Sequence, residues 1–109
     1  SIAGRRPLPG ASDYCVSKAA VIMLTQTVAT EYSTSNIRIN AIGPGFIETP
    51  MTANIRQSPE WMDTVMQMTP MQRMGQANEI ASTALFLASD ESSYFTGQTL
   101  FPNGGMFTG

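Results

Sequence analysis

The stretch DYCVSKAAVIMLTQTVATEYSTSNIRINAIGPG, residues 13–45, contains the pattern that decides the fold. From residue 13 to residue 32 no proline or glycine interrupts the chain, and mainly apolar residues recur at the three- and four-residue spacing of a helix. After a polar turn, apolar and polar residues alternate over IRINAI, residues 37–42, until Gly-Pro-Gly ends the run. The stretch therefore predicts a helix over 13–32 and a short strand over 37–42.

Two later segments repeat this order of helix and strand. Residues 77–88 carry an apolar helical pattern, and residues 97–101 form a second candidate strand before the turn PNGG. Two strands joined through a helix are typical of a right-handed parallel unit in an α/β fold. Because parallel sheets are buried on both faces, two strands are too few for a complete sheet of this class. Residues 1–109 are therefore expected to form part of a doubly wound parallel sheet.

Residues 46–75 interrupt the α/β pattern. They contain three prolines, six of the eight methionines and the single tryptophan. Proline breaks regular structure, and methionine side chains adapt to irregular surroundings. This segment is expected to be an excursion from the sheet with short, broken helices.

Composition limits the classes of partner. Six basic and eight acidic residues give a net charge of −2, with no block of like charge for nucleic acid or a membrane surface. No apolar run approaches the roughly 18 to 20 residues of a membrane span. One cysteine, Cys15, and no histidine leave no disulfide framework and no usual zinc ligand set. A cytoplasmic protein without metal, nucleic acid or membrane partner is expected.

Tyr14 and Lys18 are four residues apart at the start of the first predicted helix, so their side chains share one face. A free phenol is a poor base near neutral pH. An ammonium about 4 Å away favours a phenolate by about 4 kcal/mol, or about 3 pKa units. The pair could therefore transfer protons, although an ordinary pair on a solvated helix is the commoner explanation of this spacing.

Two further features could complete a reactive site. Ser1, thirteen residues before Tyr14, could hydrogen-bond a substrate carbonyl or a developing alkoxide. Residues 40–49 follow a predicted strand, and ligands of parallel sheets bind just beyond the carboxyl ends of the strands. Backbone groups beyond Pro44 could pair with an amide of a ligand, and Thr49 could bond a phosphate. A simple strand-ending turn is the alternative interpretation of Gly-Pro-Gly.

Side by side, these features resemble the short-chain dehydrogenase/reductase family over essentially the whole chain. The segments that carry the resemblance are Ser1-Ile2-Ala3-Gly4, YCVSKAA (14–20), RINAIGPG (38–45) with Ile47 and Thr49, PMQRMG (70–75), EIA (79–81), FLAS (86–89) and YFTGQ (94–98). They occur in the family's order. The resemblance implies the C-terminal part of a Rossmann-like doubly wound parallel sheet, from the catalytic serine onward.

The resemblance also implies an NAD(P)(H)-dependent oxidoreductase that interconverts a secondary alcohol and a ketone by hydride transfer. Ser1 would orient the substrate carbonyl, and Tyr14 would exchange a proton with the alcohol. Lys18 would favour the ionised form of Tyr14 and hydrogen-bond the nicotinamide ribose. The implied cofactor-binding residues, for NAD or NADP, are Tyr14, Lys18, Pro44, Gly45, Ile47 and Thr49.

Residues 46–75 resemble the substrate loop of the family. The residues expected to form an apolar, adaptable cover are Phe46, Met51, Trp61, Met62, Met66 and Met68. Alternatively, these side chains pack against a neighbouring helix or a partner subunit. The resemblance implies a homo-oligomer, a tetramer or dimer, built through the first helix and the C-terminal helix and strand.

Two departures from the family pattern affect these expectations. Asn103 stands where the family usually has aspartate, with little expected effect on catalysis. The phosphate loop, the NAD-or-NADP selector and the relay asparagine, which the family carries upstream of the serine, lie outside the 109 residues. The chain alone is therefore expected to be inactive. A short interaction module derived from such an enzyme is the alternative to a part of an active dehydrogenase.

Overall fold

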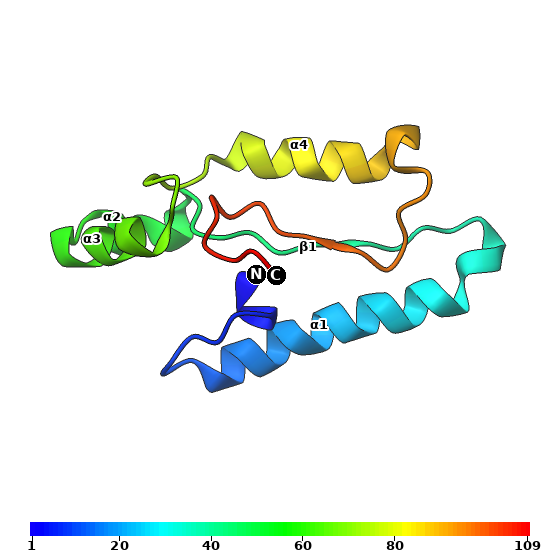
Figure 1. Ribbon diagram of the computed structural model, residues 1–109, viewed down its shortest axis with the longest axis horizontal. Coiled ribbons are helices and arrows are strands. Elements are labelled where there is room, and N and C mark those ends of the chain that lie inside the picture. The colour runs from blue at the N-terminus through cyan, green and yellow to red at the C-terminus, as the bar shows by residue number, and fades with distance from the viewer.

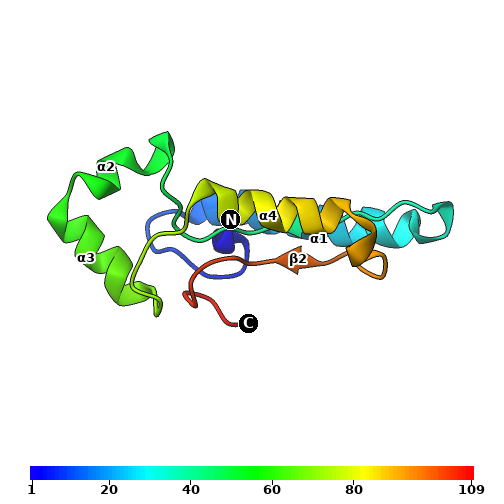
Figure 2. The same cartoon turned by 90° about the horizontal axis from the view of Figure 1, so that it is seen from above.

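In the computed structural model, which describes residues 1–109, two parallel strands lie between two long helices. Figure 1 shows α1 (Ser12–Glu31) on one side of the strands and α4 (Ala77–Ala88) on the other. This helix–sheet–helix layering is that of a doubly wound α/β fold. The molecule measures 50 × 28 × 24 Å, and α2 and α3 extend it beyond one end of the strands (Figures 1 and 2).

Local sequence explains where the two long helices begin. In the first turn of α1, the Asp13 carboxylate accepts a hydrogen bond from the Tyr14 N–H (2.8 Å) and lies at the positive end of the helix dipole. At the start of α4, the Glu79 carboxylate accepts a hydrogen bond from the Gln76 N–H (2.7 Å), as in a capping box. The observed ranges agree closely with the predicted helices 13–32 and 77–88.

The strands are shorter than the predicted ranges 37–42 and 97–101. Only β1 (Ala41–Ile42) and β2 (Thr99–Leu100) pair regularly, with Ala41 opposite Thr99 and Ile42 opposite Leu100. Upstream, one main-chain bond continues, from the Gly97 N–H to the Ile39 carbonyl (2.7 Å), and the Asn40 side chain supplies two others. Asn40 Nδ2 donates to the Phe95 carbonyl (2.9 Å) and its Oδ1 accepts from the Gln98 N–H (3.0 Å). The extended segment continues there, but without a regular strand ladder.

Short helices occupy the excursion between the two strands, as its prolines predict. They are the 3-10 helix η3 (Pro50–Thr52), α2 (Ala53–Arg56) and α3 (Pro59–Met68). Ser58 caps α3 through its Oγ, which accepts from the Trp61 N–H (3.4 Å), and Pro59 occupies the first turn. Three other 3-10 helices, η1 (Ile2–Gly4), η2 (Ser33–Ser35) and η4 (Asp90–Ser92), complete the chain.

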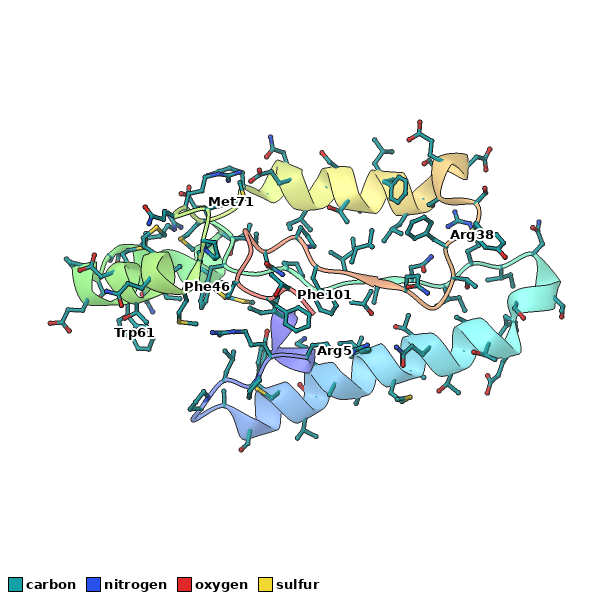
Figure 3. The ribbon with its side chains drawn as sticks, viewed as in Figure 1. Arg5, Arg38, Phe46, Trp61, Met71 and Phe101 are labelled. Carbon is teal, nitrogen blue, oxygen red and sulfur yellow. The ribbon has the colours of Figure 1, made fainter.

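The Arg38 guanidinium connects the start of the extended segment to the end of α4 (Figure 3). It donates to the carbonyls of Leu87 (2.9 Å), Ser89 (3.2 Å) and Phe95 (3.4 Å), and to Ser92 Oγ (2.9 Å). The carbonyl end of a helix favours a cation. Arg38 therefore fixes the C-terminal end of α4 relative to the sheet.

The outer faces of the two long helices are apolar and exposed. Val16 and Leu24 of α1 are 69% and 62% exposed, and Leu85 of α4 is 71% exposed. Only 11 of 109 residues are buried, because a sheet of two strands covers little of each helix. Despite these apolar faces, no helix combines the length and the apolarity needed to cross a bilayer.

Candidate active site

A cavity of about 600 Å³ lies beyond the carboxyl end of β1. Every residue that the sequence marks as catalytic or cofactor-binding contributes to its wall: Ser1, Tyr14, Lys18, Pro44, Gly45, Ile47 and Thr49. The remaining wall is formed by Pro50, Met51, Thr52, Ala77 and Ile80. Tertiary structure thus brings together four segments of the chain, at the edge where parallel sheets bind ligands.

Ser1 is held in place from two sides. The Ile2 N–H donates to the Pro44 carbonyl (3.1 Å), and η1 packs directly on α1 at Gly4. A Cβ atom on Gly4 would lie 2.8 Å from the Lys18 carbonyl oxygen, so only glycine permits this approach. Ser1 Oγ accepts from the Ala3 N–H (3.1 Å), which leaves the hydroxyl proton free to donate to a ligand.

Tyr14 and Lys18 lie on one face of α1 and touch each other. The Lys18 Nζ atom is above the Tyr14 ring, 5.3 Å from the ring centroid, which is a cation–π arrangement. Neither the Tyr14 Oη nor the Lys18 Nζ forms a hydrogen bond or an ion pair within the chain. Both polar groups are therefore available to a molecule in the cavity.

Residues 44–49, which we call the 44–49 loop, present a free backbone donor. The Glu48 N–H donates to the Gly75 carbonyl, and the Gly75 N–H donates to the Phe46 carbonyl (2.9 Å each). These bonds form the parallel bridge between Ile47 and Gly75. In extended backbone the Ile47 N–H points away from that bridge, and it has no acceptor within the chain. The loop can therefore bind an acceptor oxygen.

Thr52 and Arg56 hold the 44–49 loop, and sequence reasoning missed both. Thr52 Oγ1 accepts from the Thr49 N–H (3.1 Å) and donates to the Ile47 carbonyl (2.6 Å). Arg56 Nη2 donates to the Thr49 carbonyl (2.9 Å). The polar pattern Thr49-Pro50-Met51-Thr52, with a hydroxyl at each end of a proline-initiated turn, is the signal that could have indicated Thr52.

Few of the predicted substrate-loop residues border the cavity. Met51 contributes to its wall, and Phe46 lines a smaller neighbouring pocket of about 200 Å³ instead. Trp61 is 61% exposed and projects below α3 in Figure 3. The other side chains expected over the substrate also lie on α3 and not in the cavity wall: Met62, Met66 and Met68. Here α3 packs on α2 at the end of the molecule, outside the wall (Figure 2).

Asn103 closes the C-terminal turn in the place of the expected aspartate. Its Oδ1 accepts from the N–H groups of Gly105 (2.9 Å) and Phe107 (3.2 Å), and its Nδ2 donates to the Phe107 carbonyl (3.0 Å). An ionised aspartate could accept the first two bonds but could not donate the third. The turn also holds Pro102, whose carbonyl accepts from the Gly45 N–H (3.1 Å).

Sequence comparison finds a family and relatives for this chain. A family model described as enoyl-(acyl carrier protein) reductase matches residues 1–107. The 3-oxoacyl-[acyl-carrier-protein] reductase FabG of Thermotoga maritima is 46% identical over 106 residues, which are 97% of this chain and 42% of that protein. The chain therefore spans less than half the length of such a relative.

Solved structures share the arrangement of the chain. A 4-hydroxyisoleucine dehydrogenase complexed with NADH superimposes with a TM-score of 0.96 at 31% identity, over 100% of this chain and 45% of the other. A gluconate 5-dehydrogenase from Burkholderia cenocepacia, in complex with NADP and tartrate, gives a TM-score of 0.93 at 33% identity, over 97% and 42%. With the matching family model and these relatives, the chain belongs to the short-chain dehydrogenase/reductase family.

Proposed function

We propose that this chain carries the catalytic half of an NAD- or NADP-dependent oxidoreductase that interconverts a secondary alcohol and a ketone. The observation that carries the proposal is the meeting of Ser1, Tyr14, Lys18 and the 44–49 loop around one cavity. The NADH and NADP complexes of the structural neighbours support the cofactor class. Because the chain spans less than half of its relatives, the activity is proposed for the whole protein, and the 109 residues alone are expected to be inactive.

The cavity wall fits a nicotinamide cofactor. The free Ile47 N–H can donate to the carboxamide oxygen, and the Lys18 ammonium can donate to the ribose hydroxyls. The wall includes one cationic side chain, Lys18, and no carboxylate. Thr49 also lines it, and its hydroxyl is the group that we assign to a phosphate oxygen. When bound, the cofactor supplies or accepts the hydride.

Ser1 and Tyr14 act on the oxygen of the substrate. The Ser1 hydroxyl donates to the carbonyl oxygen and orients it, since its own position is held by the η1 cap. Tyr14 Oη gives a proton to this oxygen during reduction and accepts it back during oxidation. The Lys18 charge above the Tyr14 ring stabilises the negative oxygen that Tyr14 bears after it gives up its proton.

A homo-oligomer is the proposed state of the whole protein. Val16, Leu24 and Leu85 expose much of their apolar surface on the outer faces of α1 and α4. Apolar faces of this kind are commonly covered by another part of the protein or by a second subunit. Light scattering on the protein in its natural length would test this, and a monomer would contradict it.

The proposed function is tested by cofactor binding and turnover in the protein in its natural length. Titration with NADH and with NADPH, followed by nicotinamide fluorescence, is expected to show binding of one or both. A panel of small ketones, sugar derivatives, hydroxysteroids and acyl thioesters then identifies the substrate class. A protein that binds neither cofactor would overturn the proposal.

Ser1→Ala is expected to lower kcat by about 10²-fold, because a removed oxyanion donor typically costs that much. The dissociation constant for the cofactor should change little, since Ser1 is assigned to the substrate oxygen. Ser12→Ala, at the exposed start of α1, is the matched serine control and should keep full activity. A Ser1→Ala enzyme with wild-type kcat would show that the hydroxyl does not act on the substrate.

A further inference from the structure

The free Ile47 N–H depends on Gly75, a residue outside the cavity wall. The two hydrogen bonds of the Ile47–Gly75 bridge turn the carbonyl of Phe46 and the N–H of Glu48 toward Gly75. They therefore determine the direction of the peptide groups on either side of Ile47. A Cβ atom on Gly75 would lie 2.6 Å from Ile47 Cδ1 and 3.6 Å from Glu79 Oε2, so Gly75 lies between these two side chains. Contacts that fix the position of Gly75 therefore also fix the direction of the Ile47 N–H, which is the free donor of the 44–49 loop.

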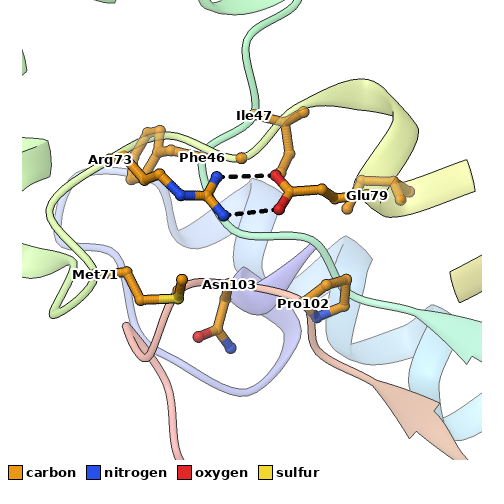
Figure 4. Close-up of a pocket in the computed structure, with 10 residues that line it drawn as sticks. Phe46, Ile47, Met71, Arg73, Glu79, Pro102 and Asn103 are labelled. Carbon is orange, nitrogen blue, oxygen red and sulfur yellow. Dashed lines mark hydrogen bonds and ion pairs between the residues drawn. The ribbon is translucent and has the colours of Figure 1, made fainter. Parts of the chain in front are cut away.

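The ion pair between Arg73 and Glu79 is hydrogen-bonded to the residues before and after Gly75. Arg73 Nη2 donates to Glu79 Oε1 (2.7 Å) and Arg73 Nη1 to Glu79 Oε2 (2.9 Å), which is a bidentate contact. Arg73 Nη1 also donates to the Met74 carbonyl (3.1 Å), and Glu79 Oε2 accepts from the Gln76 N–H (2.7 Å). The pair thereby bonds to the main chain on both sides of Gly75. Figure 4 shows the pair beside Ile47, with Met71, Pro102 and Asn103 across the small pocket.

Global stability is a poor explanation for this pair. The two side chains are 48% and 44% exposed, and ion pairs at such positions contribute little to the free energy of unfolding. The hydrogen bonds from Arg73 and from the Gln76 N–H lower the pKa of Glu79 to about 2, so its carboxylate stays ionised in mildly acidic solution as well. A charged, bidentate contact holds the two side chains in one geometry. Such a contact is better suited to positioning the main chain at Gly75 than to raising the free energy of unfolding.

We propose that Arg73 and Glu79 are positioning residues that hold Gly75, and through it the Ile47 N–H, in the geometry that receives the nicotinamide carboxamide. This inference rests on the proposed function. In this proposal, neither the Arg73 nor the Glu79 side chain touches the cofactor or the substrate. Their effect is transmitted through the Gly75 main chain to the 44–49 loop, and it is confined to the nicotinamide end of the cofactor.

Glu79→Gln in the protein in its natural length tests the proposal. Glutamine keeps the length and can still accept from the Gln76 N–H, but it loses the charge and the bidentate contact. Affinity for NADH or NADPH should fall about tenfold, the effect of one lost hydrogen bond, whereas affinity for ADP-ribose or its 2′-phosphate, which lack nicotinamide, should stay unchanged. Glu60→Gln is the matched control, because Glu60 is also an exposed carboxylate in the first turn of a helix, α3.

A second variant, Arg73→Gln, should show the same selective loss of affinity for NADH or NADPH. The double variant should bind these cofactors no more weakly than either single variant, because the two side chains act as a unit. Unchanged NAD(P)H affinity in both variants would overturn the proposal. So would an equal loss of ADP-ribose affinity, or a fall in the unfolding midpoint that parallels the loss of affinity, since either would indicate a general structural role. A wild-type protein that binds no nicotinamide cofactor would instead refute the proposed function itself.

Discussion

Tyr14→Phe is expected to lower kcat by about 10²- to 10⁴-fold, the usual contribution of a general acid or base. The variant removes only the hydroxyl that exchanges a proton with the substrate oxygen. The phenylalanine ring remains for the cation–π contact with Lys18, and no buried partner is lost, because Tyr14 is 42% exposed and its hydroxyl bonds to nothing within the chain. Cofactor affinity should therefore change little.

Tyr32→Phe provides the matched control for this prediction. Tyr32 follows the C-terminal end of α1 and is 47% exposed, so its hydroxyl is similarly accessible but far along the chain from the cavity wall. Steady-state kinetics and cofactor titration on both variants separate loss of chemistry from loss of folding. Retention of more than about a tenth of wild-type kcat by Tyr14→Phe would contradict the assignment of Tyr14 as the proton-transfer residue.

Arg38→Met is expected to lower the free energy of unfolding by about 2 to 4 kcal/mol. The guanidinium donates to three carbonyls and to the hydroxyl of Ser92, which is fully buried, and methionine replaces the stem of the side chain but none of these donors. The carbonyls at the end of α4 would lose charged partners, which costs more than losing neutral ones. Helix α4 would then be less firmly attached to the sheet.

Urea unfolding of the protein in its natural length measures this change. Arg5→Met is the control, because Arg5 is exposed directly after η1 and its side chain makes no hydrogen bond within the chain. Arg38→Lys should fall between wild type and Arg38→Met, because one ammonium cannot reach acceptors spread around a planar guanidinium. An Arg38→Met protein as stable as the Arg5→Met control would show that water replaces the guanidinium without cost.

The substrate loop shows what composition alone leaves open. Its methionines and Trp61 predict an apolar cover, and the same composition fits packing against another surface. In the structure only Met51 of this group borders the cavity, while Trp61 and its neighbours lie on α3. Apolar content indicates that a segment needs a partner, but it does not indicate which partner. The direction in which α2 and α3 leave the strands decides that.

The sequence by itself determined the features that depend on near neighbours along the chain. The spacing of apolar residues and the absence of proline set α1 and α4 almost to the residue, and four-residue spacing placed Tyr14 and Lys18 on one face. Local hydrogen bonds and helical periodicity suffice for these features. Together with the order of the spaced motifs, they also led to the correct family.

Only the tertiary structure decided the features that depend on contacts between distant segments. Asn40 bonds to Phe95 and Gln98 next to the start of β1, and Gly4 lets η1 approach α1 closely enough to place Ser1. The Ile47–Gly75 bridge likewise leaves the Ile47 N–H without an acceptor in the chain. These contacts join residues that are between 14 positions (Gly4 and Lys18) and 58 positions (Asn40 and Gln98) apart. They form only after the layers have packed, so no periodicity along the chain encodes them.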